Sequence, residues 1–174
     1  MGLIATTDAL IGCDVRDGHV ALLVGETTGH LGQSALLAEV FGRAEGDAPP
    51  VDLDTEKRHG DFIRDNHTWI TACTDLSDGG LALAAFEMAE AAGVGLWLDS
   101  DDSAFLFAED QARYLIACSF DKAEALMTAA GRAGVPIQSV GKFTSDSVWF
   151  ANTSTASLAD LSALYRRTFA DTFA

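Results

Sequence analysis

Two glycine-rich segments of the chain carry the residue types that bind phosphate groups. The first, Gly29–Ser34, follows an apolar run, Val20–Gly25, that is long enough for a buried strand. Glycine lets a backbone approach an anion closely, and the side chains of His30 and Ser34 add hydrogen-bond donors. A helix expected over Gln33–Phe41 would add free N–H groups and a partial positive charge at its start.

This first segment matches neither of the common nucleotide-binding loops. No Gly-Lys-Ser/Thr closes it, as in a Walker A loop, and it lacks the Gly-x-Gly-x-x-Gly spacing of dinucleotide sites. A tight turn followed by a helix cap explains the same residues. From chemistry alone, both interpretations stay open.

The second segment, Asp75–Gly80, also lies between an expected strand, Trp69–Thr74, and an expected helix. Ligands of α/β proteins bind at the carboxyl ends of strands, where Asp75 would lie. The carboxylates of Asp75 and Asp78 suit Mg²⁺, which prefers carboxylate and phosphate oxygens. Ser77 can donate to a phosphate or cap the helix, so a structural interpretation stays open here too.

The expected ligand contacts all come from these two segments, and no catalytic residue is expected. The residues expected to bind nucleotide or phosphate are Gly29, His30, Gly32, Ser34, Ser77, Gly79 and Gly80. Asp75 is the expected Mg²⁺ ligand.

The composition restricts the classes of partner. The 174 residues fit one domain, and their net charge of −15 disfavours binding to nucleic acid. The same charge repels a free nucleotide, so a phosphate site needs backbone N–H groups or a divalent cation. No signal-peptide pattern or membrane-length apolar run is seen, which favours a cytoplasmic location.

Other polar and sulfur-containing residues are expected to be structural or solvated. The three cysteines lie in apolar runs without metal-ligand spacing, so they are expected to be buried. His19, His59 and His67 are expected on the surface, Asp99–Asp102 as a solvated acidic turn, and Glu109–Arg113 as a polar connection before a strand.

The remaining pattern predicts a mixed α/β sheet with helices packed on it. Asp121 with Glu124, and Ser157 with Asp160, are expected to cap the last two helices. The further expected elements are a helix over Asp52–Asn66, a helix over Leu81–Ala92, strands over Val94–Leu98, Ala104–Phe107 and Tyr114–Ser119, and a hairpin of Pro136–Phe143 with Ser147–Ala151.

Several motifs in this order resemble one enzyme family. They are Gly25–Ser34, Pro49–Leu53, Gly60–Phe62, Asp75–Leu81 and Gly141-Lys142. Together they resemble the C-terminal region of phosphoribosylformylglycinamidine synthase, a member of the aminoimidazole ribonucleotide synthetase-like proteins. The resemblance covers essentially the whole chain.

The resemblance implies that residues 1–174 are one C-terminal α/β domain of a longer multidomain chain. That chain would use ATP, Mg²⁺ and glutamine-derived ammonia to convert formylglycinamide ribonucleotide to an amidine in purine biosynthesis. Its implied partners are the rest of the synthetase chain, a glutaminase subunit and a small accessory subunit. Large forms of the family bind Mg²⁺ at the position of Asp75 and a nucleotide at that of Ser77, in an auxiliary half.

Two features depart from the family pattern. Thr74 stands where the family often has histidine, and Asn66–Trp69 is more polar than usual. Most of the family's Mg²⁺ carboxylates and its ATP-binding partner domain lie outside these 174 residues, so the isolated domain is expected to be inactive. The alternative is a non-catalytic module of the pseudo-repeat that packs against its sister domain and docks the glutaminase subunit.

Overall fold

The computed structural model describes residues 6–151 and 153–173, which form one seven-stranded sheet with helices on both faces. The strand order is β2-β4-β1-β5-β3-β6-β7, and every pair is antiparallel except β3 with β6. The expected mixed sheet is thus confirmed. The strands are β1 (Val20–Val24), β2 (Ala72–Asp75), β3 (Gly95–Leu98), β4 (Tyr114–Cys118), β5 (Ile137–Thr144), β6 (Ser147–Phe150) and β7 (Thr153–Ser157).

The helices lie mostly between strands. The α-helices are α1 (Leu53–Asp65), α2 (Gly80–Ala92), α3 (Ser103–Phe107), α4 (Phe120–Ala133) and α5 (Leu158–Phe173). The shorter helical segments are η1 (Thr7–Ala9), η2 (Leu36–Val40, a single π-helical stretch) and η3 (His67–Trp69). Among the described residues, no helix is long and apolar enough to cross a membrane.

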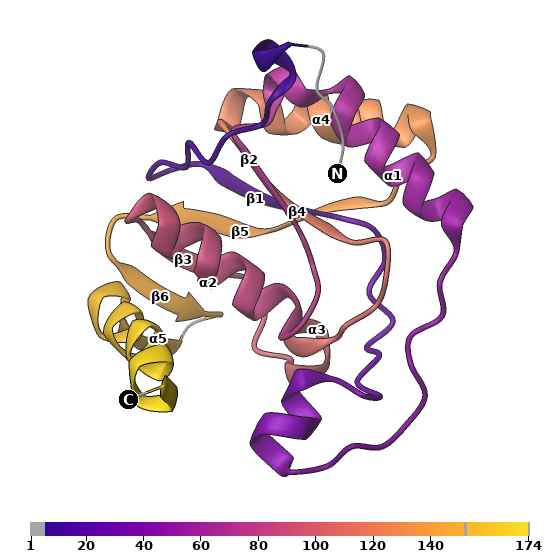
Figure 1. The fold of residues 1–174 in the computed structure, drawn as a ribbon. Helices are drawn as coiled ribbons and strands as arrows, with labels where there is room; N and C mark the ends of the chain where they lie inside the picture. Colours follow the sequence, from indigo (N-terminus) through magenta and orange to yellow (C-terminus); the bar gives the residue numbers. More distant parts are fainter. Residues whose placement is uncertain (1–5, 152, 174) are drawn as a thin grey trace.

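The central strand β1 is apolar throughout because helices cover both faces of the sheet. Ala21 and Leu23 belong to a cluster with α2, whereas Leu22 and Val24 belong to a second cluster with α1 and α4. Figure 1 shows α2 lying across one face of the sheet. Helices α1 and α4 lie close together and cover the other face. Each face of the sheet therefore has its own hydrophobic core.

Side-chain caps begin two of the helices, and the second of these caps was expected. The carboxylate of Asp52 accepts hydrogen bonds from the amides of Asp54 and Thr55 and begins α1. The hydroxyl of Ser157 accepts from the amide of Asp160 at 3.1 Å and donates to its carboxylate, as expected at the start of α5.

The expected strand over Ala104–Phe107 is wrong, because this segment is the helix α3. The carboxylate of Asp102 caps it, accepting from the amide of Ala104 at 2.9 Å. A cap of this kind favours a helical turn over an extended chain. The seventh strand of the sheet is instead β7.

The expected start of α4 is also wrong. The helix begins at Phe120 with Ser119 at its N-cap, before the proposed pair of Asp121 and Glu124. The hydroxyl of Ser119 donates to the Asp121 carboxylate at 2.6 Å, so Asp121 lies in the first turn.

The expected hairpin does not form, although its two strands do. Strand β3 lies between β5 and β6 and pairs with both. The turn after β5 therefore passes over the start of β3. A Cβ atom on Gly95 would lie 2.6 Å from the Ser147 carbonyl oxygen, so only glycine fits under this turn.

The helix expected over Gln33–Phe41 is reduced to the five residues of η2. Its apolar side chains do not join the core: Val40 is 67% exposed and Phe41 is 60% exposed. The first glycine-rich segment therefore leads into a short π-helical turn rather than a regular helix.

Candidate phosphate site

The two glycine-rich segments lie against one connection, the residues from α3 to the start of β4. A Cβ atom on Gly29 would lie 3.7 Å from the Cβ of Ala104, and one on Gly80 would lie 2.9 Å from the Leu106 carbonyl oxygen. The sheet order brings segments together that are far apart in sequence. The fold therefore brings both predicted loops into contact with the same segment, the residues from α3 to the start of β4.

The second segment presents its polar side chains to solvent. Asp75 ends the edge strand β2, and its side chain is exposed, as are those of Ser77 and Asp78. The amide of Gly80 donates to the Ser77 carbonyl at 3.0 Å, which closes the turn before α2. Asp75, Ser77 and Asp78 are therefore accessible to a ligand.

The glycines of this segment are buried and serve close packing. Gly79 is the N-cap of α2 with φ +77°, a left-handed conformation that favours glycine. Gly80 has φ +58°, and a side chain there would overlap the backbone of Leu106–Ala108. Both glycines are therefore explained by the fold of the loop itself.

The polar groups of the first segment are largely engaged within the chain. Ser34 is 1% exposed, and its hydroxyl accepts from the amide of Leu37 at 3.3 Å. The Nε2 atom of His30 lies 2.9 Å from the Asp47 carbonyl oxygen, and a Cβ atom on Gly32 would clash with that same carbonyl. A phosphate bound to this loop would have to be contacted by His30 and by the backbone at Gly29, where a Cβ atom would meet only Ala104.

Sequence reasoning missed the role of Glu109–Arg113, which was expected to be only a polar connection. One carboxylate oxygen of Glu109 accepts from the amide of Ala35 at 2.8 Å and from the amide of Gly79 at 2.9 Å. The carboxylate of Asp110 accepts from the Thr28 hydroxyl. Side-chain hydrogen bonds therefore join this connection to the second loop and to the residues on either side of the first loop.

Arg113 has the largest fully buried side chain among the described residues, at 1% exposure. Its guanidinium donates to the Thr27 hydroxyl at 3.0 Å, to the Asp110 carbonyl at 3.1 Å and to the Ala108 carbonyl. Burial lowers the pKa of Arg113, and the nearby carboxylates of Asp110 and Glu109 oppose that shift. The buried Arg113 guanidinium thus links the connection to Thr27, just before the first loop.

Asp110 is the anionic partner in this buried cluster. Burial acts to raise its pKa, but the hydrogen bond from Thr28 and the positive charge of Arg113 outweigh burial, so the pKa lies below its ordinary value. A carboxyl group whose pKa is lowered by folding stabilises the fold above its unfolded-state pKa.

This shift predicts a pH-dependent contribution of Asp110 to stability. The contribution is present above the ordinary pKa of 3.8 and is lost as pH falls through the lower folded-state value. In denaturant unfolding between pH 5 and pH 2.5, the free-energy difference between wild type and Asp110→Asn should shrink as pH falls. Thr28→Val should flatten the wild-type pH profile, and a difference that stays constant with pH would contradict the prediction.

His59 was expected on the surface and is buried, at 2% exposure. It shares one face of α1 with Phe62 and Ile63, three and four residues further on. Its Nδ1 atom lies 2.7 Å from the Ala112 carbonyl oxygen, while Nε2 has no hydrogen-bond partner within the described structure. His59 therefore links α1 to the same connection.

The three cysteines differ in exposure, and two of them have raised pKa values. Cys13 is exposed, contrary to expectation, while Cys118 is buried and Cys73 partly buried. Burial raises the pKa of both Cys73 and Cys118 to about 11, so these thiols stay protonated at neutral pH. Within residues 6–151 and 153–173, no group of three or more His, Cys, Asp or Glu side chains could hold a metal ion.

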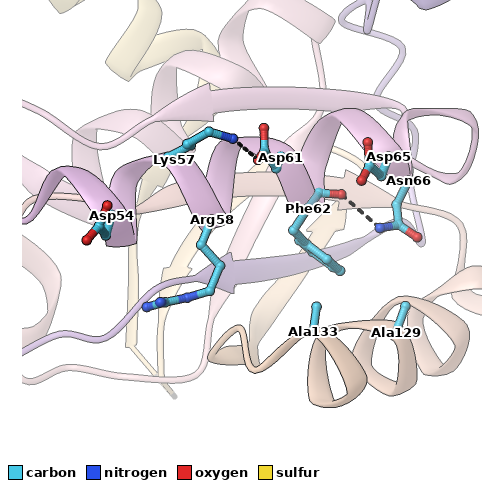
Figure 2. Close-up of a pocket in the computed structure, with 9 residues that line it drawn as sticks. All are labelled: Asp54, Lys57, Arg58, Asp61, Phe62, Asp65, Asn66, Ala129 and Ala133. Atoms are coloured by element: carbon cyan, nitrogen blue, oxygen red, sulfur yellow. Dashed lines mark hydrogen bonds and ion pairs between the residues drawn. The ribbon is translucent and has the colours of Figure 1, made fainter.

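A polar pocket of about 360 Å³ lies between α1 and α4 (Figure 2). Most of its charged side chains are exposed, and ion pairs run along α1: Lys57 contacts the partly exposed Asp61, which also accepts from Arg64 at 2.7 Å. The side-chain Nδ2 of Asn66 donates to the Phe62 carbonyl at 2.8 Å. This pocket belongs to the face opposite α2 and does not include the predicted loops.

Comparisons with known proteins define the class of this domain. The family model for the C-terminal domain of AIR synthase related proteins matches residues 16–150. The chain therefore belongs to this family.

Similar full-length proteins point to one enzyme within this family. The chain is 70% identical over 169 residues to the phosphoribosylformylglycinamidine synthase subunit PurL of Roseobacter denitrificans, which covers 97% of this chain and 23% of that protein. The chain thus spans about a quarter of the length of the curated relatives it matches.

Solved structures share the fold. T. maritima PurL complexed with FGAR superposes with a TM-score of 0.71 at 20% identity, covering 90% of this chain and 30% of that one. T. maritima PurL complexed with ATP gives a TM-score of 0.69 at 17% identity, with 90% and 28% coverage. These likenesses support the expected aminoimidazole ribonucleotide synthetase-like fold.

Proposed function

We propose that this chain is the C-terminal α/β domain of the synthetase subunit of phosphoribosylformylglycinamidine synthase. The observation that carries the proposal is the 70% identity to the Roseobacter denitrificans PurL subunit over 97% of the chain. The whole protein would act as an ATP-dependent C–N ligase on formylglycinamide ribonucleotide. It would work in the cytoplasm with the glutaminase and small accessory subunits of the synthase.

In this role the domain supplies part of a nucleotide-phosphate site. Asp75 and Ser77 are exposed at the end of β2 and just after it, which supports contact with a ligand held by another domain. His30 and Gly29 would contribute from the first loop. Gly32, Ser34, Gly79 and Gly80 would shape the backbone around the phosphate rather than contact it through side chains.

The lone carboxylate of Asp75 fits Mg²⁺ as one ligand among several. Mg²⁺ is commonly held by one or two carboxylates together with phosphate oxygens and water. When bound, it would neutralise phosphate charge that the chain's net charge of −15 otherwise repels. The remaining ligands would come from the nucleotide and from the rest of the synthetase chain.

The proposal predicts that Asp75 and Ser77 control nucleotide binding in the full-length subunit. Calorimetric titration with ADP–Mg²⁺ should show binding weakened at least about tenfold by Asp75→Asn and about threefold or more by Ser77→Ala, the loss of one charged contact and one neutral hydrogen bond. Asp17→Asn, which changes an exposed carboxylate before β1, is the matched control.

The alternative is a structural module without a nucleotide site. The engagement of Glu109 with the amides of Ala35 and Gly79 favours it, because those donors already have an anionic partner. If neither Asp75→Asn nor Ser77→Ala changes ADP–Mg²⁺ occupancy, the site proposal fails and the structural role stands. In either case, millimolar ATP–Mg²⁺ should not appreciably raise the melting temperature of the isolated 174-residue chain.

A further inference from the structure

We propose that Glu109 is a positioning residue that fastens the two glycine-rich loops to each other. Nothing in the motif pattern assigns it a role, and it lies outside both loops. The proposal that the loops share one phosphate site is the function on which this inference rests. The fastening itself is a property of the fold and can be tested without a ligand.

The geometry of one carboxylate oxygen carries the inference. Oε1 of Glu109 accepts from the amide of Ala35, 74 residues away, and from the amide of Gly79, 30 residues away. Ala35 precedes η2, which follows the first loop, and Gly79 is the N-cap of α2, which follows the second. A single atom therefore bridges the ends of the two loops.

The backbone of Glu109 strengthens the attachment to the first loop. Its amide donates to the His30 carbonyl at 2.9 Å. A carboxylate beside the first amides of α2 also lies at the positive end of the helix dipole. Hydrogen bonds to a charged group are stronger than neutral ones, so this bridge is suited to fix the distance between the loops.

The neighbouring carboxylate gives a contrast within the same connection. Asp110 accepts from the Thr28 hydroxyl and from the His30 amide, both in or next to the first loop. No hydrogen bond from Asp110 to the second loop is found in the described structure. Loss of Asp110 should therefore disturb one loop, whereas loss of Glu109 should disturb both.

Amide NMR of the ¹⁵N-labelled chain tests the bridge directly. In Glu109→Ala, the Ala35 and Gly79 amide signals should both move upfield and exchange with solvent about tenfold faster or more, since each loses a charged acceptor. Glu109→Gln, which keeps an oxygen acceptor without the charge, should restore part of the shift and protection. Asp110→Asn should leave the Gly79 amide unchanged, and Glu124→Gln, on an exposed part of α4, should leave both unchanged.

Nucleotide-binding measurements on the same variants distinguish this inference from the proposed function. In the full-length subunit, Glu109→Ala should weaken ADP–Mg²⁺ binding about tenfold, with partial recovery in Glu109→Gln. An unchanged Gly79 amide in Glu109→Ala overturns the bridge, even if Asp75→Asn still weakens nucleotide binding. Conversely, altered amides with no effect of Asp75→Asn on binding would support the bridge while the nucleotide site fails.

Discussion

Gly80→Ala should destabilise the chain by about 2–5 kcal/mol, one of the largest effects expected from adding a single methyl group. The φ of +58° at this position costs a residue with a side chain about 1–2 kcal/mol. The added Cβ would also overlap the Ala108 carbonyl and lie 2.9 Å from the Leu106 carbonyl. Forcing atoms into a packed interior costs about a further 1–3 kcal/mol.

The contact is with backbone rather than with a flexible side chain, so relief requires movement of the connection after α3. The melting temperature should fall by roughly 5–20 °C, since about 2–4 °C is lost per kcal/mol in a domain of this size. Thermal unfolding followed by circular dichroism measures the change.

Gly93→Ala is the matched control at the other end of α2. Gly93 has φ +68°, but a Cβ atom there would meet nothing within 4 Å. It should therefore cost only the conformational part, about 1–2 kcal/mol. If Gly80→Ala costs no more than Gly93→Ala, the close approach of the second loop to the connection is not a rigid feature of the fold.

Arg113→Met should cost about 3–5 kcal/mol, because it removes the cation of a buried charged cluster. The substitution keeps the apolar stem but leaves the buried Asp110 carboxylate without its positive neighbour. It also frees the Ala108 carbonyl and the Thr27 hydroxyl from their donor. Denaturant unfolding at pH 7 should show the loss as a lower midpoint.

A double-substitution cycle identifies the cause of this loss. Arg113→Met combined with Asp110→Asn should cost clearly less than the sum of the two single changes, since the uncompensated charge is then gone. Arg132→Met, at an exposed position near the end of α4, should change stability by about 0.5 kcal/mol or less. A similarly small effect of Arg113→Met would contradict a structural role for the buried cluster.

The sequence predicts elements well where one local signal dominates. The apolar run Val20–Gly25 predicts a strand, and β1 forms there because both of its faces are covered. Ser157 with Asp160 predicts the start of α5 because a capping box is satisfied within four residues. The two glycine-rich loops were likewise found from local composition, and the comparisons agree with the family that they resemble.

The errors arise where distant segments decide the outcome. The turn between β5 and β6 predicts a hairpin, but β3, some forty residues earlier than β5, takes the place between them. The role of Glu109 depends on the amides of Ala35 and Gly79, which are far away in sequence. The residues next to Glu109 in the sequence form no motif that indicates this role. His59 was an avoidable error, because its spacing from Phe62 and Ile63 places it on the buried face of α1.

The position of β1 in the sheet has a consequence for biosynthesis. This strand emerges early, but both of its neighbours, β4 and β5, lie far toward the C-terminus. At about 5–20 residues per second, the ribosome needs on the order of 5–20 s to make the chain between Val24 and Tyr114. Throughout that interval the nascent polypeptide carries an unpaired apolar segment, which is the kind of surface that chaperones recognise.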